Sequence, residues 1–127
     1  MRALRTPLAR VRGLGSAKGG TSHWWAQRLS SLAMIPLTVW FVASVVAMAG
    51  ADHAAMQAWI ASPLVAGLLI LLVVATFYHG YLGLQVVIED YVHHEGVKIA
   101  SIVAVKGLAI LLSLSAILSI LSILFQG

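Results

Sequence analysis

Long apolar runs without charged side chains dominate the pattern of this sequence. The first run extends from Leu29 to Ala51 and the second from His53 to Ile88, and neither contains Asp, Glu, Lys or Arg. A third run, from Ile99 to Phe125, contains one charged residue, Lys106. A helix that crosses a bilayer needs about 20 predominantly apolar residues, so each run is long enough to span. The runs are continuous rather than alternating, which favours helices over barrel strands.

The pattern therefore predicts an all-α membrane protein that forms a single membrane-anchor domain over residues 1–127. Ser62 and Pro63 suit the start of the second span, because serine caps helices and proline fits the first turn. The three predicted transmembrane helices cover residues 29–50, 62–88 and 99–125.

Positive charge gathers before the first span. Six of the eight Lys and Arg residues precede Leu29, and no acidic residue occurs before Asp52. Because positively charged flanks stay on the cytoplasmic side, residues 1–28 are predicted to be a basic cytoplasmic segment, with the N-terminus inside and the C-terminus outside after three crossings. A basic tail next to an apolar span is a topology signal, so we expect no nucleic-acid partner.

Composition narrows the chemistry further. With 61% hydrophobic and 9% charged residues, the chain is too apolar for a water-soluble surface and is expected to contact membrane lipid. It contains no cysteine, which excludes disulfides and thiolate-bound iron–sulfur clusters from this chain. A redox cofactor would have to be held by His, Met or a partner chain.

His79 is the ionisable residue that stands out in the second span. It precedes Glu89 by about 15 Å of helix, which puts it near the bilayer midplane. A protonated imidazole is costly there, so we expect a neutral ring with both nitrogens engaged. Three interpretations remain open: an axial haem ligand, a member of a proton relay, or a hydrogen bond to a neighbouring helix.

Several neighbours share one helical stripe with His79. Gly83 lies one turn on, and its missing side chain leaves room for a flat macrocycle or for close packing of another helix. Asp90 returns to nearly the same face after three turns. Tyr91 beside it has a phenol that can donate a hydrogen bond to a carbonyl, although tyrosine is also common at the headgroup level.

The start of the first span holds a second polar group. Trp24 and Trp25 suit interfacial anchoring. His23 and Arg28 fit the interface equally well, or fit as partners of a buried cofactor carboxylate.

These residues carry a family resemblance. His79, Gly83, Asp90 and Tyr91 resemble the H-x3-G-x6-D-Y pattern of the small hydrophobic membrane anchor of succinate dehydrogenase, respiratory complex II. The segment SAKGGTSHWWAQRLSSLAMIPL is similar to that of alphaproteobacterial members. The resemblance covers nearly the whole chain from Gly15 onward and includes the three-span layout.

The resemblance implies specific roles. His79 would be an axial ligand of the iron of haem b, shared with a second, partner membrane anchor, and Gly83 would leave room for the haem. Arg28 and His23 would lie near the haem propionates or the quinone pocket. Tyr91 would bind a carbonyl of ubiquinone, with Asp90 at the quinone site or its proton supply.

The resemblance also implies partners and a location. Succinate oxidation, flavin and iron–sulfur clusters would belong to a flavoprotein subunit and an iron–sulfur subunit, so this chain would not itself oxidise succinate but would help pass electrons to quinone. The expected location is the bacterial inner membrane, with the mitochondrial inner membrane as the alternative. A different class of function is a haem-free structural or accessory subunit of a membrane transporter, in which His79 only bonds a neighbouring helix.

Overall fold

The computed structural model describes residues 20–126, and this part of the chain is helical without strands. Its elements, in chain order, are α2 (Gly20–Ala47), α3 (His53–Ile60), α4 (Pro63–Tyr91) and α5 (Glu95–Gln126). Residues 1–19, which hold most of the predicted basic segment, lie outside the described part.

Three of the four helices are long and apolar enough to cross a membrane: α2, α4 and α5, with 27, 29 and 32 residues in their candidate spans. At about 1.5 Å of rise per residue, each exceeds the roughly 30 Å of a hydrocarbon core. The predicted fold class, an all-α membrane protein with three spans, is confirmed. The orientation of the termini stays a prediction.

The helices run beyond the spans predicted from hydropathy. The helix α2 begins at Gly20 rather than residue 29, α4 ends at Tyr91 rather than residue 88, and α5 begins at Glu95 rather than residue 99, whereas α2 ends at Ala47, before the predicted residue 50. The physical reason is that hydropathy marks the part of a helix that lipid surrounds, whereas backbone hydrogen bonding continues through polar residues at the interface. As a result Arg28 and Asp90, predicted in flanking segments, lie on helices.

The turn between α4 and α5 is short and capped. Val92 is extended, with φ −96° and ψ 114°, which ends α4. The backbone N–H of Val97 donates to His94 Nδ1 at 3.1 Å, so the imidazole of His94 caps the start of α5. Glu95 in the first turn of α5 lies 3.8 Å from the ammonium of Lys98. His93 and His94 therefore belong to the connection, well away from the middle of either span.

The connection between α2 and α4 contains a helix that hydropathy did not predict. Asp52 caps it, because its Oδ1 accepts from the N–H of Ala55 at 2.8 Å. Gly50, with φ +86°, provides the left-handed turn before it. Trp59 of α3 stacks near Trp40 of α2 with ring centroids 5.8 Å apart, which ties this end of α2 to the rest of the bundle.

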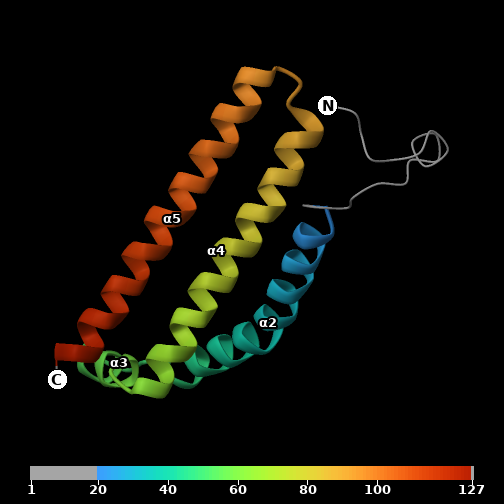
Figure 1. Ribbon diagram of the computed structural model, residues 1–127. Coiled ribbons are helices and arrows are strands. Elements are labelled where there is room, and N and C mark those ends of the chain that lie inside the picture. Colours follow the sequence, from blue (N-terminus) through green and yellow to red (C-terminus); the bar gives the residue numbers. More distant parts are fainter. Residues whose placement is uncertain (1–19, 127) are drawn as a thin grey trace.

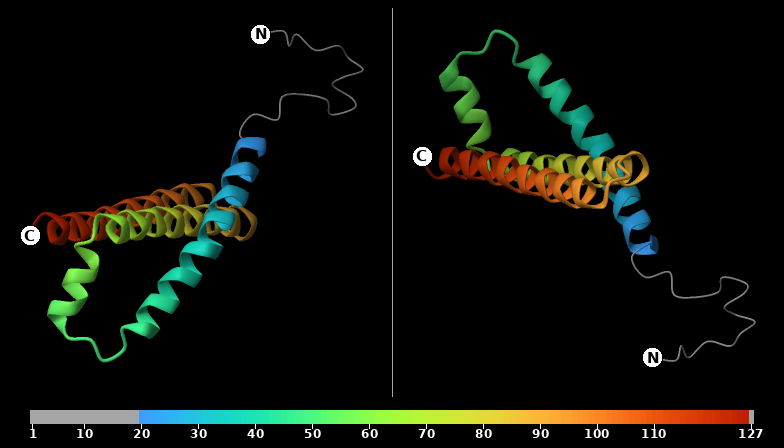
Figure 2. Two further views of the ribbon diagram at one scale, coloured as in Figure 1. Left: turned by 90° about the horizontal axis from the view of Figure 1, so that it is seen from below. Right: turned by 90° about the horizontal axis from the view of Figure 1, so that it is seen from above.

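The helices α4 and α5 run side by side in opposite directions, while α2 crosses α4 at an angle (Figures 1 and 2). Near α3 a small core forms around Ala66, Leu69 and Ile120. Leu82 of α4 and Ser30 of α2 are also buried, and Ser30 contacts His79 of α4. Most large apolar side chains elsewhere are exposed, as expected of a bundle covered by lipid and partner chains.

Candidate functional site

His79 lies on α4 where α2 crosses it, and α2 surrounds its imidazole with polar side chains. Its Nδ1 is 3.1 Å from Ser30 Oγ and 3.4 Å from Ser31 Oγ. Its Nε2 is 3.5 Å from Gln27 Nε2. Gln27, Ser30 and Ser31 are spaced i, i+3, i+4 and therefore share one face of α2. Both nitrogens of the ring consequently face groups from a helix about fifty positions earlier in the chain.

The hydrogen bonds of the two serines define the tautomer of His79. Ser30 Oγ and Ser31 Oγ each donate to the backbone carbonyl of Gln27 at 3.0 Å. Because a hydroxyl has a single proton, both oxygens can only accept from the imidazole. In an uncharged ring this arrangement puts the proton on Nδ1 and leaves the lone pair on Nε2.

The Nε2 side of the ring is poorly satisfied. The contact to Gln27 Nε2 is at the outer limit of a hydrogen bond. Gln27 Oε1 is buried and has no hydrogen-bond partner within the described residues, a state that costs about 1–3 kcal/mol. The Nε2 side of His79 therefore faces a region whose polar groups lack good partners within residues 20–126.

Such an imidazole suits metal ligation through Nε2. A ligating histidine normally donates its other ring N–H to an acceptor that orients it, and Ser30 is such an acceptor. In residues 20–126 no group of three or more His, Asp or Glu side chains is placed to hold a metal ion. His79 could therefore serve as one ligand of a haem iron, whose other ligand would come from outside residues 20–126.

Gly83 lies one turn beyond His79 and is half-buried. A Cβ built at Gly83 would meet no heavy atom within 4 Å, and the same holds for Gly80. Packing among residues 20–126 therefore does not require glycine at either position. The space beside Gly83 is available to a group from outside the chain.

Asp90 and Tyr91 lie in the last turn of α4, and both are exposed, Tyr91 to 77%. At 1.5 Å per residue they are roughly 17 Å from His79 along the helix axis. The structure thus joins them to His79 through one unbroken helix without bringing them into contact with it. Their side chains face the surroundings of the protein, where a ligand or a partner chain can reach them.

Arg28 and His23 lie on the first turns of α2. The guanidinium of Arg28 is 5.0 Å from the centroid of the Trp24 ring, a cation–π distance, and Trp24 meets Trp25 edge to face at 4.9 Å. Arg28 is exposed and His23 half-buried. The residues that contact His79 are instead Gln27, Ser30 and Ser31.

Sequence reasoning did not assign Gln27, Ser30 and Ser31 to the site. A signal was present, since three polar side chains with i, i+3, i+4 spacing lie where the polar start of α2 gives way to its apolar part. That spacing marks a polar face, but only the crossing of α2 over α4 shows that the face meets His79.

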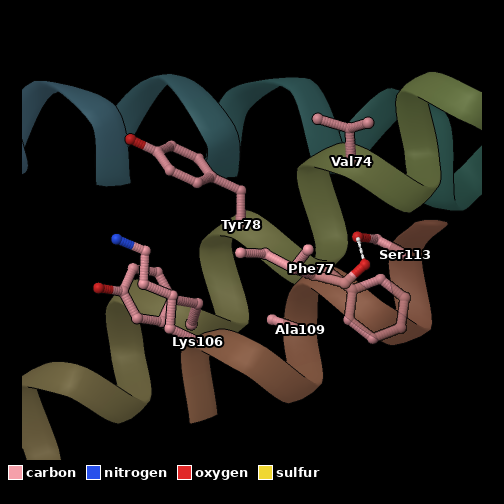
Figure 3. A pocket seen from close by; sticks show the side chains of 8 residues that line it. Val74, Phe77, Tyr78, Lys106, Ala109 and Ser113 are labelled. Carbon is pink, nitrogen blue, oxygen red and sulfur yellow. Dashed lines mark hydrogen bonds between the residues drawn. The ribbon is translucent and has the colours of Figure 1, made fainter. Parts of the chain in front are cut away.

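A separate hollow of about 240 Å³ lies between α4 and α5. Figure 3 shows Tyr78 and Lys106 extending from its rim. The hydroxyl of Ser113 donates to the carbonyl of Ile110 at 3.1 Å. Its lining is otherwise mostly apolar, and Lys106 is exposed. The position agrees with a lysine whose stem lies along apolar surface. The imidazole of His79 does not line this hollow.

Comparison with known proteins decides the family. The family model described as "Succinate dehydrogenase/Fumarate reductase transmembrane subunit" matches residues 2–121. The chain belongs to this family. Among its relatives are proteins named succinate dehydrogenase hydrophobic membrane anchor subunit. The one from Rickettsia bellii is 29% identical over 116 residues, covering 91% of this chain and 93% of the relative. The one from Paracoccus denitrificans is 34% identical over 86 residues, covering 68% and 67%.

No solved structure gives a significant match to this membrane anchor. Its three apolar helices and its family identify it as a multi-pass membrane anchor of the inner-membrane type. The alphaproteobacterial resemblance seen in the sequence agrees with the Rickettsia and Paracoccus relatives. The transporter alternative is set aside, since the family is that of a succinate dehydrogenase anchor.

Proposed function

We propose that this membrane anchor helps to bind haem b and ubiquinone and to pass electrons from the iron–sulfur subunit to quinone. The observation that carries the proposal is the setting of the His79 imidazole: its Nδ1 lies 3.1 Å from Ser30 Oγ, whose hydroxyl donates to the carbonyl of Gln27, and its Nε2 lies 3.5 Å from Gln27 Nε2. A haem bound there would supply one-electron redox chemistry within the membrane.

His79 would serve as one axial ligand of the haem iron, and the second membrane anchor of the complex would supply the other. Three of the other four histidines lie far from His79, which supports a second ligand from outside; the fourth, His23, is assigned below to anionic groups. His93 and His94 follow α4, and His53 begins α3. Each is separated from His79 along the chain by about 20 Å or more of helix. Gly83 supports the assignment, because the open space beside it leaves room for a macrocycle.

Arg28 and His23 would bind anionic groups near the start of α2, either the haem propionates or groups of the quinone pocket. Arg28 is one residue from Gln27 and is exposed, so its guanidinium can reach a carboxylate outside the chain. A guanidinium binds a carboxylate with two parallel N–H donors, which makes this contact stronger than a neutral hydrogen bond.

Tyr91 and Asp90 would act at the quinone. The Tyr91 phenol would donate a hydrogen bond to a quinone carbonyl, and Asp90 would hold a proton for the reduction, which takes up two protons. Their exposure at the end of α4 supports this role, because a quinone and water can reach both side chains there. The iron–sulfur subunit would deliver electrons on the same side.

Partners are implied by the same assignment. Family membership associates the chain with the catalytic subunits of succinate dehydrogenase. The absence of cysteine in this chain means that the iron–sulfur clusters belong to another subunit. We expect the second membrane anchor to cover exposed apolar surface of the bundle next to His79.

The test is the haem spectrum of the purified complex in two matched variants. His79→Ala should remove the spectrum of a haem with two histidine ligands, whereas His53→Ala, an exposed residue at the start of α3, should leave it unchanged. A wild-type complex without haem would leave His79 as a plain helix–helix hydrogen bond and overturn the proposal. Retention of the spectrum in His79→Ala would assign the ligand elsewhere.

A further inference from the structure

Ser30 is buried, and its Oγ lies 3.1 Å from Nδ1 of His79. We infer that Ser30 is a positioning residue: its hydroxyl oxygen holds Nδ1–H of His79, fixes the tautomer that offers Nε2 to the iron, and lowers the reduction potential of the haem. This inference rests on the proposed haem ligation. It adds a residue from α2 to the stripe that the sequence indicated on α4.

The geometry favours Ser30 over its neighbour. Ser30 Oγ lies 3.1 Å from His79 Nδ1, whereas Ser31 Oγ lies 3.4 Å away. Ser30 is 9% exposed and is the one buried polar residue within residues 20–126. A hydrogen bond removed from water is electrostatically stronger, so Ser30 should make the dominant contact and Ser31 a weaker, secondary one.

The hydrogen bonds of His79 and Ser30 form a chain in which each group donates to the next. Nδ1–H of His79 donates to Ser30 Oγ, and the Ser30 hydroxyl donates to the backbone carbonyl of Gln27 at 3.0 Å. Each bond in such a chain polarises the next, so the serine oxygen becomes a better acceptor than an isolated hydroxyl. The carbonyl anchors the hydroxyl rotor, which prevents Ser30 from donating to Nδ1 and reversing the tautomer.

The reduction potential of the haem iron depends on the basicity of the His79 imidazole. An acceptor at Nδ1 pulls its proton partly away and increases electron density on the imidazole. A more basic ligand stabilises the more highly charged, oxidised iron. Removal of the Ser30 hydroxyl should therefore raise the midpoint potential of the haem.

The experiment measures that potential in the intact purified complex, together with the electron paramagnetic resonance spectrum of the oxidised haem. Ser30→Ala should shift the potential upward and change the spectrum, and Ser30→Thr, which keeps the hydroxyl, should restore both. Ser31→Ala should give a smaller shift in the same direction. Ser44→Ala is the control, because Ser44 Oγ also donates to a carbonyl of α2, that of Trp40 at 2.7 Å, in a different part of the helix.

The outcomes separate the inference from the function on which it rests. A wild-type complex without haem refutes the proposed function. A Ser30→Ala complex that keeps its haem with unchanged potential and spectrum refutes the role of Ser30 and leaves haem ligation intact. If Ser30→Ala loses haem, recovery in Ser30→Thr supports the hydroxyl, and loss in both variants overturns the inference in favour of a size requirement at the crossing.

Discussion

Replacement of Tyr91 by Phe removes a single oxygen atom from the last turn of α4. Tyr91 is 77% exposed, so its hydroxyl is not part of the packed interior and its loss should leave folding and assembly unchanged. The change therefore isolates whatever Tyr91 does for a bound quinone.

The size of the effect follows from the hydrogen bond that would be lost. A neutral hydrogen bond contributes about 0.5–1.5 kcal/mol net, and one to a charged group about 1.5–3 kcal/mol. The quinone carbonyl oxygen gains negative charge during reduction, so the contribution of its hydrogen bond rises from the first range toward the second. With roughly 1.4 kcal/mol per factor of ten, kcat/KM for quinone should fall about tenfold to one-hundredfold.

The assay compares two electron acceptors on the same preparation. Succinate-driven reduction of ubiquinone should fall in Tyr91→Phe, while succinate-driven reduction of an artificial dye and the haem content should match wild type. Tyr78→Phe is the matched control, because Tyr78 is a half-exposed tyrosine of the same helix, more than three turns away. Unchanged quinone kinetics would remove Tyr91 from the site, and an equal loss with the dye would indicate an assembly defect instead.

Two further predictions test the space beside His79 and the capping of α3. Gly83→Ala should lower the haem content of the complex if a macrocycle lies against Gly83, and Gly107→Ala on α5 should leave it unchanged. An added Cβ meets no heavy atom within 4 Å at either position, so a loss of haem in Gly83→Ala alone would come from contact with the haem. Equal haem content in the two variants would refute the close approach. Asp52→Ala should lower the free energy of unfolding of the protein by about 1 kcal/mol, because the 2.8 Å hydrogen bond from Ala55 N–H to the Asp52 carboxylate is lost. Ser62→Ala should have little effect, because Ser62 makes no side-chain cap bond, and equal losses in the two variants would contradict the capping argument.

The described structure separates what hydropathy can predict from what it cannot. The three spans follow from the sequence because uncharged apolar length alone decides whether a segment can cross a bilayer. The ends of the helices did not follow, since a helix continues through Glu89 and Asp90 once these side chains reach the interface. The short α3 was missed because its stability rests on Asp52 as a cap and on Trp59 packing against Trp40, which are local and tertiary contacts rather than hydropathy.

Some residues of the candidate site could be found from the sequence, and others only from the structure. The sequence alone singled out His79, because an ionisable residue within an apolar span is costly and must be used or satisfied. It also put Gly83 one turn away on the same helix and aligned Asp90 with that face, because the periodicity of a helix is fixed, although the predicted span ended at residue 88. It did not reveal the partners of the imidazole. Ser30 is 49 positions from His79, and only the crossing of α2 over α4 brings its hydroxyl within 3.1 Å of Nδ1 and so decides which nitrogen keeps the lone pair.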